Sequence, residues 1–342
     1  MVKTIFTLLV LISAGLAQTS SDGPSSVHHS QDVDFLLSAP QMHEVEGFYS
    51  GSVAFASSVV PSVPVSLPSI KKEVQEVNLT FTVIDRHGHF VRNLAPSDFT
   101  IQDNGEPPER ITYFESQSEL PLRLAIVIDS SDSVGYAFND EKRSAAVFLK
   151  RILRRTSDLA LIIGFNQEVR LAQDLASDNK LLSNAIRKLP GGGSTAIYDA
   201  VSAASQQLVK VRDAEAVHRA IILITDGEDN SSHIKLEQAE EVAKRNECAV
   251  YVMSINWETD RDLEKFDRAM KQLSEVTGGN FLRAHSEEGV TIAFSNIDKE
   301  LRSQYLISYK PANVSPDGSF HRLVVSGPKK LRIHHRDGYF AR

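Results

Sequence analysis

The chain has 342 residues, which is more than one ordinary domain contains. Its 37 Lys and Arg stand against 44 Asp and Glu, giving a formal net charge of −7. Nucleic-acid binding needs a basic face to displace counterions, so this composition argues against it. A hydrophobic fraction of 42% allows a sizeable core in a soluble protein.

The N-terminus predicts an exported protein. Lys3 precedes an apolar run over residues 5–12, and small residues lead up to Ala17. This is the pattern of a secretory signal peptide at 1–17, and an uncut anchor is the alternative. The run is too short to span a bilayer, which takes ~20 residues. We therefore expect a periplasmic or extracellular protein that is not integral to the membrane after cleavage.

Two segments with the pattern of β-strands flank the middle of the chain. Residues 18–72, rich in Ser and Pro, are predicted to be a flexible tether. In residues 73–118, apolar positions such as Val77 and Val83 lie in a two-residue alternation, typical of half-buried strands. The same alternation returns in residues 304–342, a segment too small to fold well alone. Our hypothesis is that the two β segments pack into one small β-sandwich.

The region between them, residues 119–303, alternates buried strands with helices. Four apolar runs have the length of strands covered on both faces: Leu122–Ile128, Leu159–Phe165, Ala220–Thr225 and Ala249–Ile255. Segments with helical periodicity separate them. The alternation predicts an α/β fold with a doubly wound, mostly parallel, Rossmann-like sheet. Such sheets bind ligands at the carboxyl ends of their strands.

Oxygen-bearing side chains gather in three loops expected at that edge. Asp129, Ser131 and Ser133 follow the first buried strand, Thr195 follows a Gly-rich turn that opens a helix, and Asp226 follows the third buried strand. A hard divalent cation such as Mg²⁺ takes oxygen ligands. Two carboxylates and three hydroxyls suit one such ion and leave it room for one outside oxygen.

These three motifs together resemble the metal-ion-dependent adhesion site (MIDAS) of the von Willebrand factor A-domain family. The resemblance covers roughly residues 119–303 and implies that the five residues hold a divalent cation, Mg²⁺ with Mn²⁺ or Ca²⁺ as alternatives. It further implies a protein partner whose Asp or Glu side chain fills the open coordination position. The flanking β segments and the ending Arg336–Tyr339 resemble an exported bacterial subgroup of that family.

Asp132 departs from the family pattern, which has a small residue, often Gly, at that place. Its extra charge leaves three outcomes open: stronger cation binding, preference for a larger ion, or repulsion of an acidic ligand. Local explanations also exist for the ligands, since Thr195 alone is a suitable N-cap for the following helix. Glu228, Asp229 and Asp199 are candidates either for groups behind the ligands or for solvated side chains. We interpret the histidine pair His334-His335 as surface residues.

The prediction is a binding and adhesion module rather than an enzyme. A phosphotransferase would use Asp129 as its nucleophile, but the second Asp of that motif is replaced by Ser131. The Gly-rich turn has no Lys after it and is not a P-loop. A structural or assembly scaffold with a silent metal site is the main alternative, and a metal-dependent phosphotransfer enzyme is the third.

Overall fold

The computed structural model describes residues 76–116, 119–132, 138–211, 213, 215–255, 263–313 and 316–341, without the side chains of 138–141 and 263. The predicted signal peptide and tether lie outside these residues, and so does the candidate ligand Ser133.

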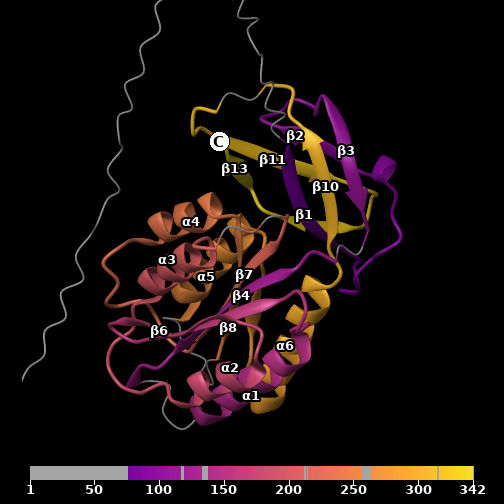
Figure 1. Ribbon diagram of the computed structural model, residues 1–342. Coiled ribbons are helices and arrows are strands. Elements are labelled where there is room, and N and C mark those ends of the chain that lie inside the picture. The colour runs from indigo at the N-terminus through magenta and orange to yellow at the C-terminus, as the bar shows by residue number, and fades with distance from the viewer. Residues whose placement is uncertain are drawn as a thin grey trace, which may run out of the picture. The chain divides into compact units, whose positions relative to one another are not determined.

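A six-stranded sheet forms the centre of the larger domain (Figure 1), in the order β6-β5-β4-β7-β8-β9. Its strands are β4 (Leu122–Asp129), β5 (Leu159–Phe165), β6 (Val169–Ala176), β7 (His218–Thr225), β8 (Cys248–Ser254) and β9 (Phe281–Arg283). Neighbouring strands are parallel except β5 and β6, which pair antiparallel. The chain crosses over through helices, as parallel pairing requires.

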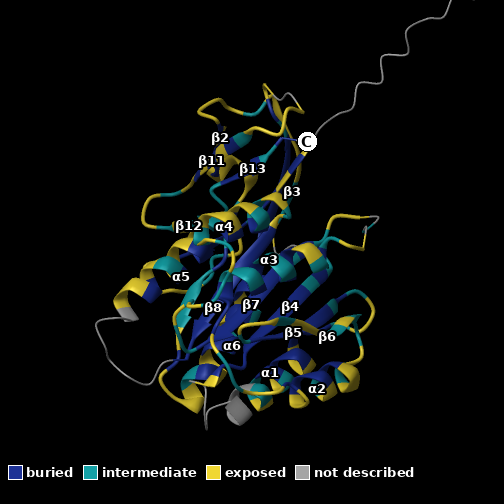
Figure 2. Ribbon diagram, turned by 90° about the vertical axis from the view of Figure 1, so that its left-hand side faces the viewer, coloured by how far each residue is buried: buried dark blue, intermediate teal, exposed yellow. Residues whose placement is uncertain are grey.

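Two layers of helices cover the two faces of this sheet. They are α1 (Phe138–Ile152), α2 (Asn179–Arg187), α3 (Ile197–Leu208), α4 (Leu236–Arg245), α5 (Leu263–Thr277) and α6 (Glu287–Leu301). In the central strand β4, Leu124 and Ile126 pack in the core with α1, α2 and α6, whereas Ala125 and Val127 pack in the core with α3, α4 and α5. Because β4 is buried on both faces, its sequence is a continuous apolar run (Figure 2). No helix in the described ranges is long and apolar enough to cross a membrane.

The structure confirms the predicted α/β fold class and adds one strand. The predicted buried strands and helices are present within a few residues of their expected bounds. The strand missing from the prediction is β6, at the edge of the sheet. Most of its residues are exposed or half-buried, so its sequence shows neither an apolar run nor a strict alternation.

Seven further strands form two antiparallel sheets, which we call the flanking β module. They are β1 (Val77–Ile84), β2 (Thr100–Asp103), β3 (Arg110–Glu115), β10 (Tyr305–Lys310), β11 (Phe320–Ser326), β12 (Arg332–His335) and β13 (Gly338–Phe340). One sheet has the order β12-β1-β10-β3 and the other β13-β11-β2. Strands from before and after the α/β domain therefore pair directly, and one hydrophobic core includes side chains from both sheets.

A buried polar network joins these two sheets. The Asp103 carboxylate on β2 accepts hydrogen bonds from the hydroxyls of Tyr309 (2.9 Å) and Tyr339 (2.7 Å). Its other oxygen lies 2.7 Å from Nδ1 of His321. These side chains are all less than a tenth exposed, so the network stabilises the module only while every member keeps its partner.

Candidate metal site

Four of the five sequence-predicted ligands lie at the carboxyl edge of the central sheet. Asp129 is the last residue of β4, and Asp226 directly follows β7, the parallel neighbour of β4. Thr195 lies two residues before α3. The edge therefore holds Asp129, Ser131, Thr195 and Asp226, whereas Ser133 is outside the described residues.

Asp129 is the buried centre of this site. Its side chain is inaccessible to solvent, and its two oxygens accept hydrogen bonds from the Ser131 N–H (2.9 Å) and the Thr225 hydroxyl (2.7 Å). Burial raises the pKa of Asp129, and these hydrogen bonds partly oppose that effect. The donors recorded for Asp129 within the described part of the chain are neutral. A buried carboxylate in such surroundings favours a cation beside it.

The Gly-rich turn lies directly against the loop that carries Ser131. The Gly192 N–H donates to the Ser130 carbonyl (2.7 Å), and the Asp132 N–H donates to the Gly193 carbonyl (3.0 Å). Gly193 has a φ of +99°, and a Cβ there would collide with the Gln167 side chain. Residues with a Cβ rarely adopt this φ, so glycine suits this position of the turn.

The N-cap explanation of Thr195 is wrong. The N-cap of α3 is Ala196, and the first-turn N–H of Ile197 donates to the Asp229 carboxylate at 2.7 Å. Thr195 as a whole residue is only 3% exposed. Its side-chain hydroxyl is an oxygen of the kind that a hard metal ion takes.

The other acidic residues near the site have local roles. Asp229 caps α3, and Asp199 accepts hydrogen bonds from the backbone N–H groups of His233 and Ile234. These bonds hold the loop after β7 against α3. Asp132 is exposed, and its carboxylate lies beside Gly192.

The donor set fits a hard divalent cation better than a soft one. No group of three or more His, Cys, Asp or Glu side chains that would hold a metal occurs in the described ranges. The predicted set has two carboxylates and depends on hydroxyls for the rest, which suits Mg²⁺ more than metals that prefer sulfur or nitrogen.

Sequence reasoning missed two residues that support these ligands. Thr225 ends β7 and donates to Asp129, as a Thr at the end of a strand next to a ligand-bearing strand can do. Asn230 contacts the backbone of Thr195, and no local sequence pattern indicates that contact. Only the fold brings Thr225 to Asp129 and Asn230 to Thr195.

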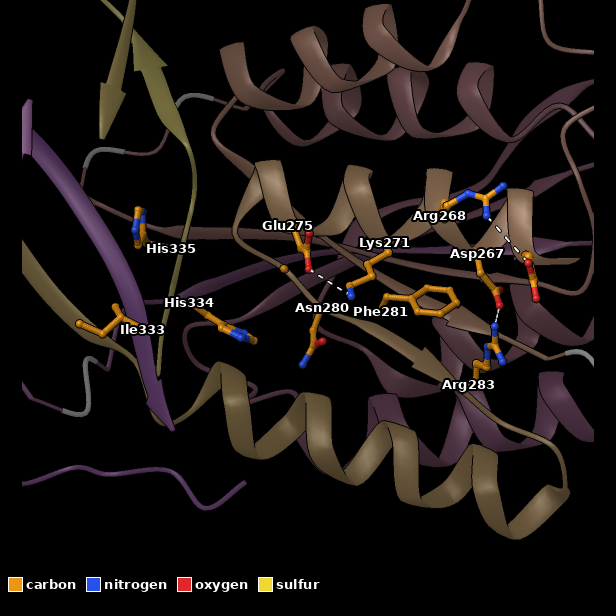
Figure 3. Close-up of a pocket in the computed structure, with 12 residues that line it drawn as sticks. Asp267, Arg268, Lys271, Glu275, Asn280, Phe281, Arg283, Ile333, His334 and His335 are labelled. Atoms are coloured by element: carbon orange, nitrogen blue, oxygen red, sulfur yellow. Dashed lines mark ion pairs between the residues drawn. The ribbon is translucent and has the colours of Figure 1, made fainter. Parts of the chain in front are cut away.

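A separate cleft of about 690 Å³ lies between α5, β9 and β12 (Figure 3). Its lining contains none of the sequence-predicted metal ligands. The acidic side chains that line it form ion pairs with neighbouring bases, such as Glu275 with Lys271 at 3.8 Å. His334, interpreted from the sequence as a surface residue, is half-buried here because β12 pairs with β1, which covers one side of the strand.

The fold and the edge site define an α/β domain of the doubly wound class with a candidate cation site. Residues 124–291 match the family model of the von Willebrand factor type A domain. This part of the chain is therefore a von Willebrand factor type A domain.

The chain is also similar to calcium-activated chloride channel regulator 1 from Bos taurus, with 25% identity over 243 residues. The match covers 68% of this chain and 24% of the bovine protein, so the chain spans about a quarter of that relative's length.

Solved structures with a similar fold have low sequence identity. A von Willebrand factor type A protein from Catenulispora acidiphila has 12% identity and a TM-score of 0.47, covering 79% of this chain and 74% of its own. Proximal thread matrix protein 1 from the mussel byssus, with a zinc-occupied MIDAS motif, has 16% identity and a TM-score of 0.46, covering 56% of this chain and 48% of its own. We draw no functional conclusion from likenesses at this level.

Proposed function

We propose that this protein is an exported, metal-dependent binding module that attaches to an acidic side chain of a protein partner. The observation that carries the proposal is the buried Asp129 carboxylate, whose recorded hydrogen bonds come from neutral donors. The von Willebrand factor type A domain supports it, since the family's modules typically mediate protein adhesion. Asp129, Ser131, Ser133, Thr195 and Asp226 would hold the cation, with Mg²⁺ as the preferred ion.

The chain's own residues provide a site with few charged ligands and several neutral ones. Two carboxylates balance a divalent charge, and the hydroxyls add oxygens without adding charge. When bound, the cation supplies an open coordination position for an Asp or Glu oxygen of the partner. The protein holds the three loops in place, and the buried edge excludes water from the Asp129 side.

The first test is a calorimetric titration of Mg²⁺, Mn²⁺, Ca²⁺ and Zn²⁺ into chelator-treated protein. The sharpest variant is Thr195→Val, because it removes the candidate hydroxyl ligand with little change of shape. We expect saturable one-to-one binding in the wild type and at least tenfold weaker binding in the variant, with equal thermal stability of the metal-free proteins. Glu241→Ala is the matched control, since Glu241 is half-exposed on α4 and pairs with Arg245.

The second test measures partner chemistry with a peptide library that differs only in the presence of Asp or Glu. Binding that requires the acidic residue, and that is lost in EDTA and in Thr195→Val, supports the proposal. Binding that is insensitive to both changes would contradict it.

A silent scaffold remains the competing function, and the calorimetric titration separates the two. A scaffold needs the loops but not the ion, so the wild type would show no saturable heat with any of the four cations. Catalysis is not part of this proposal.

A further inference from the structure

The Thr195 backbone is held on both sides by the loop that follows β7. Its N–H donates to the side-chain oxygen of Asn230 at 2.8 Å. Its carbonyl accepts from the N–H groups of Asn230 (3.0 Å) and Ser231 (3.1 Å). The same loop carries Asp226, so these three hydrogen bonds join two of the loops that bear candidate ligands.

The position of Thr195 needs such a restraint. It follows the turn that contains Gly192 and Gly193, both with positive φ, and glycine restricts its neighbours less than any other residue. Asp229 rather than Thr195 caps α3, and the Ala196 N–H, directly after Thr195, donates to the Asn166 carbonyl at 2.9 Å. Within the described part of the chain, Asn230 is the side chain that bonds to the Thr195 backbone.

We propose that Asn230 is a positioning residue of the metal site, which fixes Thr195 relative to Asp226 and thereby sets the affinity for the cation. This inference rests on the proposed function. Asn230 is itself exposed and acts through the Thr195 backbone. The physical reason is that Mg²⁺ requires ligands in near-octahedral geometry. A ligand that moves freely in the metal-free protein loses conformational entropy when the ion binds, and this loss weakens the affinity. Groups that orient metal ligands typically change metal affinity by roughly 10- to 100-fold when removed.

The test is a calorimetric Mg²⁺ titration of the full chain carrying Asn230→Ala. We expect binding about tenfold weaker than in the wild type. Asn230→Asp keeps an oxygen at the position that accepts the Thr195 N–H, so it should bind at least as tightly as the wild type. Ser232→Ala is the control, because the Ser232 hydroxyl accepts from the N–H groups of Tyr198 and Asp199 in the same loop contact but does not bond to Thr195.

A double-mutant cycle shows whether Asn230 acts through Thr195. If it does, Asn230→Ala should have no further effect on Mg²⁺ affinity in the Thr195→Val background. Additive losses would show that Asn230 acts by another route and would overturn the inference.

Amide hydrogen exchange of the metal-free protein gives a readout that does not depend on the ion. The Thr195 N–H should exchange at least several-fold faster in Asn230→Ala and at the wild-type rate in Ser232→Ala. Unchanged exchange, or a Mg²⁺ affinity equal to that of the wild type, would overturn the role of Asn230 while leaving the proposed function intact. Absence of binding by any of the four cations in the wild type would instead refute the proposed function, and this inference with it.

Discussion

Glu300, in the last turn of α6, is a buried carboxyl group whose charge we expect to affect stability near neutral pH. It is 3% exposed. One oxygen accepts from the Asn280 amide at 3.2 Å, and the other is buried without a hydrogen-bond partner among the described residues. Burial raises the pKa of Glu300 to about 7. The exchange Glu300→Gln keeps the shape of the side chain and removes its ionisation.

The magnitude follows from the difference between the folded and unfolded pKa values of Glu300. Protonated Glu300 makes its full contribution to the free energy of unfolding below pH 4.5, the pKa of the unfolded chain. This contribution is lost as the pH rises through about 7, the pKa in the folded protein. At about 1.36 kcal/mol per pH unit, this difference corresponds to a penalty on the order of 3 kcal/mol above pH 7. Glu300→Gln should remove this penalty, so we expect the variant to be more stable than the wild type at pH 8.

Histidines that are buried or half-buried lower the free energy of unfolding at acid pH. Burial lowers the pKa of His218 to about 4, and it also lowers the pKa values of His334 and His335. These groups must take up protons on unfolding below pH 6.5, so their contribution to stability is lost as the pH falls from there. Comparing Glu300→Gln with the wild type at each pH cancels the contribution of His218. It does not cancel that of His334, whose Nδ1 lies 4.0 Å from a Glu300 oxygen.

The assay is urea unfolding of both proteins at pH 5, 6, 7 and 8. The free energy of unfolding of Glu300→Gln should exceed that of the wild type by a margin that grows from pH 5 to pH 8. Glu264→Gln is the control, since the Glu264 side chain is 73% exposed and should show no such trend. A stability difference that is the same at pH 5 and pH 8 would refute the reasoning about Glu300.

Three further outcomes are expected. Thr225→Val should lower the free energy of unfolding by ~1–3 kcal/mol in chemical denaturation, because Asp129 loses a buried donor, and an unchanged value would contradict this role. Asp103→Ala should cost about 3 kcal/mol in the same assay, because it leaves the hydroxyls of Tyr309 and Tyr339 without their shared acceptor, whereas a neutral effect would show that the network is dispensable. Mg²⁺ at a hundred times its Kd should stabilise the wild type by ~2.7 kcal/mol in thermal unfolding, and this gain should disappear in EDTA and be smaller in Thr195→Val.

Most of the α/β fold was predictable because burial leaves a strong periodic signal. The strand β4 is covered on both faces, so its residues from Leu124 to Ile128 are all apolar, and its prediction is confirmed. The edge strand β6 was not predictable for the opposite reason. Most of its positions are exposed or half-buried, where polar and apolar residues are both tolerated, so no pattern marks the strand. The short strands β12 and β13 escaped prediction because three or four residues carry too little periodicity.

The candidate ligands were identifiable from the sequence because they are side chains of a fixed chemical type at fixed spacing after apolar runs. Asp129, Ser131, Thr195 and Asp226 lie at one edge of the sheet, since parallel strands end on the same side. Their assignment as metal ligands stays a prediction, as does the assignment of Ser133.

The sequence by itself determined the fold class and the chemistry of the edge, because both depend on residue type and periodicity along the chain. The tertiary structure alone decided which groups support those ligands. Thr225 reaches Asp129 across 96 positions, and Asn230 reaches Thr195 across 35. Such contacts follow from the crossover of parallel strands and from loop conformations fixed by glycine, and a hydrogen bond between distant residues leaves no periodic trace in the sequence.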